Sequence, residues 1–328
     1  MVDQRDSGTC QDTVGVIVPM FNARHTINAT LRSVCEQTYR NLDIVVVDDG
    51  SMDDSPSIVA AWCERDRRIR LLRQPNAGVA MARNAGAAAT TAQFLAFIDA
   101  DDLWAPTKIE FQLGEMQSGG ADVGLVYCWY ASIGQDDRVI TFGPQPLDEG
   151  FVLKRLCASN LIGNGSTLLL RRSVFEAVGG FDPGLRARGL DAAEDYQICL
   201  RIAERSEFRV VPRYLVGYRS VPGSMSSYSL RMFLATRMAL MEYRDKYPDY
   251  AGVIDTQLQD FGHWFAWGAM RQGRWGDAAR LVAVCVTARP VAAPLRFAFM
   301  AFMTLKSRLL RHLGVQQPFL PIYTNTVW

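Results

Sequence analysis

The sequence predicts an α/β fold, a mostly parallel sheet flanked by helices, followed by a C-terminal region that is helical throughout. The first observation is a set of short continuous apolar runs, which are typical of strands covered on both faces. These runs are VGVIV at 14–18, IVVV at 44–47 and FLAFI at 94–98. The second observation is that helical patterns lie between the runs, the first with Ile27, Leu31 and Val34 on one face. Strands that alternate with helices favour βαβ units and therefore parallel pairing.

The remaining elements follow in chain order with less regular spacing. Further strands are expected at 123–130, 166–170 and 208–220, a loop at 141–150, and helices at 173–178 and from Glu194 onward. From about Ser227 the patterns are helical only, with helices expected at 227–247, 251–271 and 274–288. The polar residues 1–12 are expected to be disordered.

The composition excludes several classes of protein. The chain has 328 residues, of which 49% are hydrophobic and 21% charged, and its net charge of +1 gives no basic field for nucleic acid. Its three histidines are far apart and its seven cysteines include no C-x-x-C pair, so we expect reduced thiols and a cytoplasmic protein. The polar N-terminus does not resemble a signal peptide, and no apolar run approaches the roughly 18 residues of a membrane span.

Polar clusters follow the first three predicted strands, at 19–22, 48–51 and 99–102. Because parallel strands end at one edge of a sheet, these clusters are expected to meet in one crevice. Asp99 and Asp101 are one residue apart, so an extended backbone points both carboxylates to the same side. Such oxygens suit Mg²⁺ or Mn²⁺ together with phosphate oxygens. The spacing alone equally fits a solvated loop with helix-capping acids.

Seven segments carry a resemblance to a known family. They are VIVPMFNA (16–23), VVVDDGSMDD (45–54), NAGVAMARNAG (76–86), FIDADDLW (97–104), GGFDP (179–183), EDYQICLR (194–201) and YRSVPGSMS (218–226). In this order they resemble the inverting glycosyltransferases of family 2, which have the GT-A fold. The resemblance implies a GT-A glycosyltransferase domain at 13–226 and leaves the helical extension at 227–328 outside the shared core.

The resemblance also implies roles for individual residues. Asp195 corresponds to the general base that takes a proton from the acceptor, with Glu194 beside it, and Asp101 corresponds to the ligand of Mg²⁺ or Mn²⁺. The residues expected at the nucleotide sugar are Pro19, Phe21, Asn22, Asp48, Asp49, Arg83 and Asp99. Asp102 is expected to be structural, and Tyr218, Arg219 and the turn at 222–226 to close over the donor phosphates.

Three of these roles have a chemical basis and an open alternative. A carboxylate at Asp49 can accept the imide N–H of uracil or of guanine, but Asp48 to Ser51 can also form a plain turn. Phe21 can stack on a base or belong to the core. Arg83 can bind a diphosphate or pair with an acid on a helix surface.

The leading hypothesis is a metal-dependent inverting glycosyltransferase. It moves one sugar from a nucleoside diphosphate sugar, with UDP favoured, to a hydroxyl of a saccharide or lipid-linked glycan. The alternatives are a non-catalytic nucleotide-sugar-binding protein on the same fold and a D-x-D phosphohydrolase. The aromatic and basic segment 291–313 fits either a membrane surface, at the inner face of the membrane, or a helix packed on the domain or a second subunit.

Overall fold

The computed structural model describes residues 12–190, 192–219 and 229–288. The chain divides into two compact units, one of residues 1–156 with 160–221 and one of residues 157–159 with 222–328. The functional division into a catalytic domain at 13–226 and an extension at 227–328 stays a prediction.

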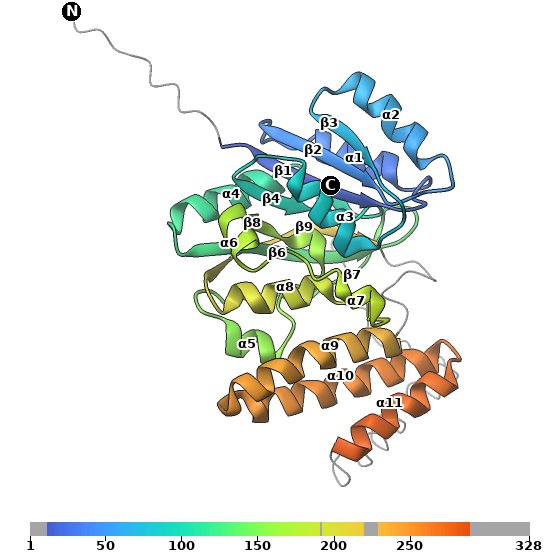
Figure 1. The fold of residues 1–328 in the computed structure, drawn as a ribbon, viewed down its shortest axis with the longest axis vertical. Coiled ribbons are helices and arrows are strands. Elements are labelled where there is room, and N and C mark those ends of the chain that lie inside the picture. The colour runs from blue at the N-terminus through green and yellow to red at the C-terminus, as the bar shows by residue number, and fades with distance from the viewer. Residues whose placement is uncertain (1–11, 191, 220–228, 289–328) are drawn as a thin grey trace, which may run out of the picture. The chain divides into compact units, whose positions relative to one another are not determined.

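The first unit is built on one nine-stranded sheet (Figure 1). Its order is β3-β2-β1-β4-β8-β6-β9-β5, and β7 pairs with β6. The strands are β1 (Val14–Met20), β2 (Leu42–Asp48), β3 (Ile69–Arg73), β4 (Phe94–Phe97), β5 (Leu103–Trp104), β6 (Val123–Ile133), β7 (Val139–Phe142), β8 (Leu169–Arg171) and β9 (Glu207–Arg219). The helices are α1 (Ile27–Cys35), α2 (Ser55–Arg65), α3 (Val79–Ala88), α4 (Lys108–Ser118), α5 (Leu153–Ala158), α6 (Arg172–Ala177), α7 (Gly184–Ala187) and α8 (Glu194–Ala203).

The strand directions confirm the predicted fold class. The β1–β2, β1–β4, β2–β3 and β6–β9 pairs are parallel, whereas β8 is antiparallel to both β4 and β6. Because β8 is antiparallel to both of its neighbours, β4 and β6 run in the same direction. The carboxyl ends of β1, β2, β4 and β6 therefore lie at one edge of the sheet.

Alternation along β2 shows why helices cover both faces of the sheet. Ile44 and Val46 pack in the large core with residues of α1, α2 and α4, whereas Val45 and Val47 pack against Ala82 of α3. All of these β2 side chains are at most 1% exposed, because successive residues of a strand point to opposite faces. The continuous β-branched run is therefore what a strand buried on both sides requires.

Two sequence predictions are corrected here. The strand expected at 166–170 begins only at Leu169, because Gly165–Thr167 forms a 3₁₀ turn before β8. The loop expected at 141–150 begins inside β7, which pairs with β6. The sequence analysis also missed β3, whose residues are mostly exposed after Ile69, and β5, which has two residues.

The described part of the second unit is helical, as expected. Its elements are α9 (Ser229–Lys246), the 3₁₀ turn at Pro248–Tyr250, α10 (Ala251–Arg271) and α11 (Trp275–Ala288). Phe233 of α9 and Phe265 of α10 meet edge to face, 6.5 Å between ring centroids, in a core that includes Leu281 of α11. At Gly262 the helices approach closely, since a Cβ there would lie 2.1 Å from Sγ of Cys285.

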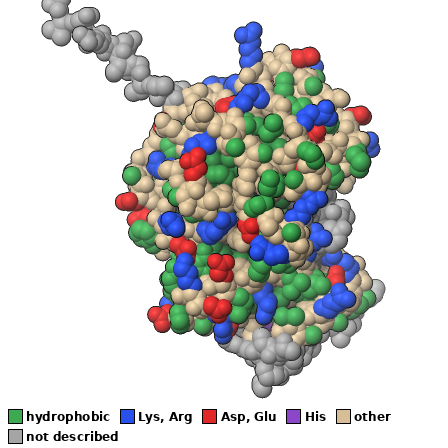
Figure 2. All heavy atoms as spheres, in the orientation of Figure 1, with side chains coloured by type: hydrophobic (Ala, Val, Ile, Leu, Met, Phe, Trp, Pro, Cys, Tyr) green, Lys and Arg blue, Asp and Glu red, His purple; other side chains and the backbone are tan. Residues whose placement is uncertain are grey.

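The described surface shows mixed charge. On the face drawn in Figure 2, basic and acidic side chains are interspersed. None of the helices in the described ranges is both long enough and apolar enough to cross a membrane. The expected N-terminal disorder and the segment 291–313 lie outside the described residues, apart from residue 12.

Candidate active site

The aspartate loop after β4 is anchored by its most buried carboxylate. Asp102 is 0% exposed; its Oδ2 accepts a hydrogen bond from the Ser166 hydroxyl at 2.6 Å, and its Oδ1 accepts one from the Arg219 backbone amide at 2.9 Å. Burial, and then the charges of Asp101 and Asp99, raise the pKa of Asp102 well above its usual value. Asp102 therefore holds the loop in place, which is the structural role expected of it.

Asp101 differs from its neighbours in having a carboxylate with little to hold it. The residue is half-buried, and no side chain in the described ranges donates a hydrogen bond to it. Burial, together with the charge of Asp99, raises the pKa of Asp101 to about 6. A bound cation would stabilise the ionised form of such a group.

Arg83 on α3 joins the aspartate loop to the first turn of α8. Its Nη2 donates to Oδ1 of Asp99 and its Nη1 to Oε1 of Glu194, both at 2.6 Å, although Arg83 and Glu194 are 111 positions apart. The Arg83 side chain is 2% exposed. Burial alone would lower its pKa, but the adjacent carboxylates outweigh this and raise it. Arg83 is thus a buried bridge between two acidic segments, not a helix-surface residue, and its contact with a diphosphate stays a prediction.

Asp195 lies beside this bridge. A Cβ built on Gly165 would lie 3.0 Å from Nη2 of Arg83 and 3.6 Å from Cβ of Asp195, so the three residues are neighbours. Oδ1 of Asp195 accepts a hydrogen bond from the Tyr196 backbone amide at 2.7 Å, and the described residues provide no partner for Oδ2. Burial and the charge of Glu194 raise the pKa of Asp195 to about 7, with Arg83 opposing them. A general base is most effective when its pKa lies near the working pH.

The backbone before the acid pair is strained. Ala193 has a φ of 99°, in the left-handed region, which costs a non-glycine residue about 1–2 kcal/mol. Such conformations persist where the surrounding structure holds them and are concentrated at functional sites. The strained turn sets the direction in which α8 starts, and so the direction of Glu194 and Asp195.

Asp48 and Asp49, at the end of β2, are bonded to the neighbouring loops. Asp49 is 4% exposed, and its carboxylate accepts three hydrogen bonds of 2.8 Å from groups in residues 74–78. Asp48 is 1% exposed, and its Oδ1 accepts one from the Ser51 backbone amide at 2.9 Å. Both acids therefore build turns at this edge of the sheet, and base recognition by Asp49 stays a prediction.

The end of β1 presents an aromatic ring. Phe21 is 49% exposed, so it is not a core phenylalanine. Asn22, with a φ of 50°, accepts a hydrogen bond through Oδ1 from the Met52 backbone amide at 2.9 Å and thereby ties this loop to the one after β2. Pro19 is buried within β1, opposite Val47. Phe21 and Asn22 thus directly follow β1 at the carboxyl edge of the sheet, and their contact with a nucleotide sugar, like that of Pro19, stays a prediction.

Arg219, at the end of β9, holds the aspartate loop from its other side. It is 3% exposed, and its guanidinium donates at 2.6 Å to the carbonyl oxygens of Asp101 and Gly134 and to the carboxylate of Asp137. Its side chain is therefore engaged with the protein instead of closing over donor phosphates. The turn expected at 222–226 to accompany it lies, like the rest of 220–228, outside the described residues.

The sequence analysis missed Ser166 and Gly165. The Ser166 hydroxyl accepts a hydrogen bond from the Asp99 backbone amide at 3.0 Å while donating to Asp102, so it links two members of the aspartate loop. Gly165 leaves the space that the Arg83 guanidinium occupies. The signal was the glycine pair in IGNGST, which interrupts the strand predicted there.

The residues present fit a divalent cation whose ligands come mainly from substrate phosphates and water. The described residues contain no group of three or more His, Cys, Asp or Glu side chains that could hold a metal by themselves. Mg²⁺ in proteins is often held by one or two carboxylates together with substrate phosphates and water. The available carboxylate of Asp101 suits that arrangement.

The fold and the site together define the class of protein. The mostly parallel sheet flanked by helices is similar to the fold of the GT-A glycosyltransferases. The chain matches Glycosyl transferase family 2 over residues 15–179. It therefore belongs to glycosyl transferase family 2, a family of transferase enzymes, which confirms the family inferred from the motifs.

Relatives and solved structures extend the comparison. UDP-Glc:alpha-D-GlcNAc-diphosphoundecaprenol beta-1,3-glucosyltransferase WfgD of Escherichia coli is 36% identical over 143 residues, covering 43% of this chain and 55% of that protein. The chain spans about half the length of the first curated relatives it matches.

Two solved structures have a similar fold. S. aureus TarS 1–349 in complex with UDP-GlcNAc has a TM-score of 0.61 and 16% identity, covering 82% of this chain and 80% of that one. Mannosyltransferase PcManGT from Pyrobaculum calidifontis, in complex with GDP-Man and Mn²⁺, has a TM-score of 0.62 and 22% identity, covering 90% of this chain and 81% of that one.

Proposed function

We propose that this protein is a metal-dependent inverting glycosyltransferase that moves one sugar from a nucleoside diphosphate sugar, with UDP favoured, to a hydroxyl of a saccharide or lipid-linked glycan. The observation that carries this proposal is the Arg83 bridge, which brings the acid pair at the start of α8 next to the aspartate loop. The relative WfgD is named for UDP-Glc and a diphosphoundecaprenol-linked acceptor, and the two structural neighbours hold UDP-GlcNAc and GDP-Man with Mn²⁺.

Asp195 is the proposed general base. Its Oδ2 takes the proton of the acceptor hydroxyl while the acceptor oxygen attacks the anomeric carbon of the donor. The bond from that carbon to the diphosphate oxygen breaks, and the nucleoside diphosphate leaves from the opposite face, so the configuration inverts. Glu194 and burial keep the pKa of Asp195 near 7, where the group is both ionised in part and basic enough to accept the proton.

The donor-binding side of the site follows from the loops after β1 and β2. Phe21 offers an exposed ring for stacking on the base, and Asp49 supplies an acceptor for its imide N–H. The loops after β1 and β2 are held in shape by Pro19, Asn22 and Asp48. Asp99, which accepts a hydrogen bond from Arg83, is the proposed contact to the ribose of the donor or to the metal shell.

Asp101 is the proposed ligand of Mg²⁺ or Mn²⁺. When bound, the cation would neutralise negative charge that develops on the leaving diphosphate. The test is Mn²⁺-dependent binding of UDP by titration calorimetry, in which Asp101→Asn should weaken Mn²⁺-dependent UDP binding at least about tenfold. Asp136→Asn, whose side chain is 64% exposed, is the matched control and should bind as the unmodified protein does.

The overall activity is tested by measuring nucleoside diphosphate release from UDP-, GDP- and dTDP-sugars with Mn²⁺, with p-nitrophenyl phosphate in parallel. Release from at least one donor, with the sugar found on an acceptor by mass spectrometry, is the expected result. Donor binding without any release would favour the non-catalytic alternative. Cleavage of p-nitrophenyl phosphate without release from any donor would favour the phosphohydrolase.

We further propose a cytoplasmic protein that meets its acceptor at the inner face of the membrane through the basic, aromatic segment 291–313. Co-sedimentation with vesicles containing anionic lipid tests this. The full chain should sediment with the vesicles, and a chain ending at residue 288 should not. Absence of sedimentation for both would exclude the membrane contact and leave the transferase proposal intact.

A further inference from the structure

Lys108, the first residue of α4, is the one buried lysine among the described residues, and the proposed mechanism does not use it. Its side chain is 0% exposed, and within the described ranges no carboxylate lies at ion-pair distance from its Nζ. Burial lowers the pKa of Lys108 to about 8, so the ammonium form still predominates at pH 7. The start of a helix also disfavours a cation. A charge kept here therefore needs a reason beyond packing.

Two uncharged groups hold this ammonium. Nζ of Lys108 donates to Oε1 of Gln112, one turn further along α4, at 2.6 Å. It also lies 4.1 Å from the centroid of the Trp104 ring. Cys128 faces Lys108 as well, but burial raises the pKa of its thiol to about 11, so it supplies no negative charge. Lys108 is thus paired with an amide oxygen and a ring face instead of with an acid.

Lys108 determines which way the Gln112 amide faces. An ammonium group can only donate hydrogen bonds, so the amide presents its oxygen to Lys108 and its NH₂ group to the opposite side. There Nε2 of Gln112 donates to the carbonyl oxygens of Thr167, at 2.7 Å, and Val126, at 2.9 Å. A reversed amide would set its oxygen against two carbonyls and its NH₂ group against the ammonium. Lys108 therefore directs a donor at Thr167.

Trp104 supplies a second donor to the same turn. Its Nε1 donates to the Ser166 carbonyl oxygen at 2.9 Å, while Lys108 covers a face of its ring. Ser166 and Thr167 are successive residues of the 3₁₀ turn at Gly165–Thr167, and both of their carbonyl oxygens are held in this way. Lys108, Gln112 and Trp104 together form a clamp on this turn, the lysine clamp.

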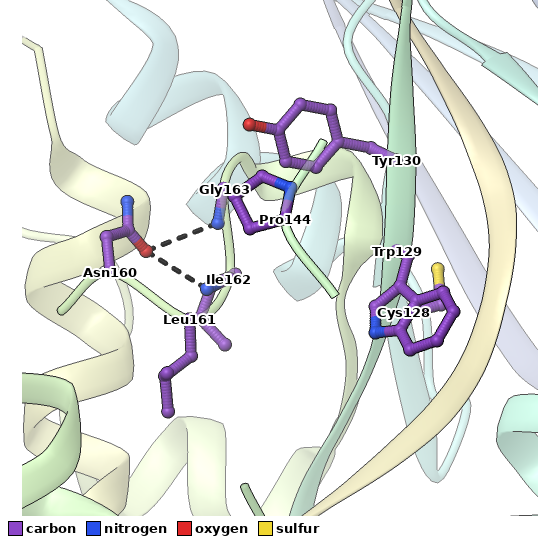
Figure 3. A pocket seen from close by; sticks show the side chains of 8 residues that line it. All are labelled: Cys128, Trp129, Tyr130, Pro144, Asn160, Leu161, Ile162 and Gly163. Atoms are coloured by element: carbon purple, nitrogen blue, oxygen red, sulfur yellow. Dashed lines mark hydrogen bonds between the residues drawn. The ribbon is translucent and has the colours of Figure 1, made fainter. Parts of the chain in front are cut away.

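The residues that lead into the turn are fixed as well (Figure 3). Oδ1 of Asn160 accepts hydrogen bonds from the backbone amides of Ile162 and Gly163, at 3.0 and 3.2 Å. Gly163, whose φ is 80°, lies against the Tyr130 ring, since a Cβ there would be 2.2 Å from Cε1 of that ring. The chain therefore reaches the turn from a fixed direction, and the lysine clamp holds the turn at its other end.

The same turn holds groups that the proposed reaction needs. The Ser166 hydroxyl accepts a hydrogen bond from the Asp99 backbone amide and donates one to the Asp102 carboxylate. Gly165 leaves the space for the Arg83 guanidinium, which joins the aspartate loop to the first turn of α8. A shift of the turn would therefore move the aspartate loop and crowd the bridge together. Misplacing reacting groups by about 1 Å can lower a rate by about 10²-fold.

We propose that Lys108 is a positioning residue for the transferase reaction, acting through Gln112 and Trp104 on the turn that fixes the aspartate loop. A neutral side chain at this position would leave the Gln112 amide free to reverse and the Trp104 ring without its cation. This role explains why a charge is kept where an apolar side chain of similar volume is often no less stable. The inference rests on the proposed metal-dependent transferase function, because its effect is read at the aspartate loop.

The experiment is Lys108→Met in the full-length protein. Methionine keeps an unbranched chain without the charge, so urea unfolding should show no large loss of stability. By titration calorimetry, Mn²⁺-dependent UDP affinity should fall at least about fivefold, while UDP affinity without metal stays within about twofold. The kcat for transfer should fall roughly 10- to 100-fold. Lys246→Met makes the same change at an exposed lysine that also lies over a ring, 5.5 Å from the centroid of Tyr247, and should alter none of these quantities.

Two further variants test the route. Trp104→Phe keeps a ring beside Lys108 and removes only the N–H that binds Ser166, so the same selective loss of Mn²⁺-dependent affinity is expected in a protein with its charge intact. Ser166→Ala removes the hydroxyl through which the turn holds the aspartate loop. Adding Lys108→Met to Ser166→Ala should lower that affinity by less than about twofold more, because both changes act through one turn.

The outcomes separate the clamp from the proposed function. The positioning role is wrong if Lys108→Met and Trp104→Phe both keep Mn²⁺-dependent affinity and kcat within about twofold of the parent. It is also wrong if UDP affinity falls equally with and without metal, or if the effects of Lys108→Met and Ser166→Ala are fully additive. A protein whose Mn²⁺-dependent UDP binding responds to these changes, but which releases no nucleoside diphosphate from any donor, would contradict the transferase function and support the clamp.

Discussion

The aspartate-lined edge of the sheet and the helical unit at 229–288 bury polar groups in different ways. Within the described residues, every buried Asp, Glu, Lys and Arg belongs to the first unit, namely Asp48, Asp49, Arg83, Asp102, Lys108, Glu194 and Arg219. The buried polar side chains of the helical unit are a hydroxyl, two amides and an imidazole, those of Thr236, Gln257, Gln259 and His263.

This difference distinguishes a region that buries charged groups from a region that is held together by apolar packing. Burying a charge costs several kcal/mol unless it is paired and hydrogen-bonded, so replacing such groups by apolar ones is often stabilising. The first unit keeps seven such residues, and those at the aspartate loop and at the start of α8 are best explained by a requirement for a polar, preorganised environment. The helices instead follow ordinary rules of apolar packing, with Phe233, Phe265 and Leu281 at the centre. The predictions below test whether this division holds.

The largest effect is expected for Asp195→Asn. Losing a general base lowers a rate by roughly 10²–10⁴-fold, so transfer should fall by about 10³-fold while UDP affinity stays within about twofold. Steady-state kinetics and calorimetry measure the two quantities. The matched change in the helical unit, Asp255→Asn, should leave the transfer rate unchanged. Loss of donor binding by Asp195→Asn would remove Asp195 from the base role.

Arg83→Met should cause the largest loss of stability. It leaves Asp99 and Glu194 without their partner, and breaking a buried ion pair typically costs about 3–5 kcal/mol. Arg244→Met is the counterpart among the helices, where the pair with Asp255 is 36% and 34% exposed and its loss should cost far less stability. Urea unfolding measures both. Equal costs would contradict the contrast between the two regions.

Gly262→Ala should destabilise the helical unit alone. The added methyl would lie 2.1 Å from Sγ of Cys285, and overpacking of this kind costs about 1–3 kcal/mol. Gly252→Ala on the same helix meets no atom within 4 Å and should be neutral or slightly stabilising. Helix loss by circular dichroism, with UDP binding unchanged, is the expected pattern. A large fall in UDP affinity would show that the two units are coupled.

The mildest perturbation is a change of pH, whose effect on activity should be confined to the site. Because the pKa of Asp195 is raised to about 7, kcat/KM for the acceptor should rise about tenfold per pH unit below 7 and level off above it. The same shift makes this group's contribution to stability present at low pH and lost as pH rises through about 7. The residual activity of Asp195→Asn should lack the rise near 7. A parent profile that is flat from pH 5 to 8 would contradict the raised pKa.

Much of the fold could be predicted from local patterns. Continuous apolar runs indicated β1, β2 and β4, and helical periodicity indicated α1 and the three long helices, because these signals depend only on which faces are buried. The patterns could not give β5 or the shift of β8, since a strand of two or three residues has no period to detect. They also missed β3, whose exposed side chains lack the apolar run.

The candidate site was predicted less completely. The motifs identified the acids, and the crevice followed from the rule that parallel strands end at one edge. The partners of those acids could not be predicted, because Arg83 and Glu194 are 111 positions apart and nothing local marks them as a pair. Ser166 and Arg219 were hidden for the same reason, since their hydrogen bonds reach the aspartate loop across 64 and 117 positions.

By itself, the sequence determined which side chains are available and on which kind of element each one lies, because periodicity, turn residues and motif order are local properties. Only the tertiary structure decided which acids are committed to holding loops and which one has no side-chain donor among the described residues. The physical reason is that a hydrogen bond or a desolvated charge depends on groups brought together from distant segments. Their identity is settled only when the sheet has formed.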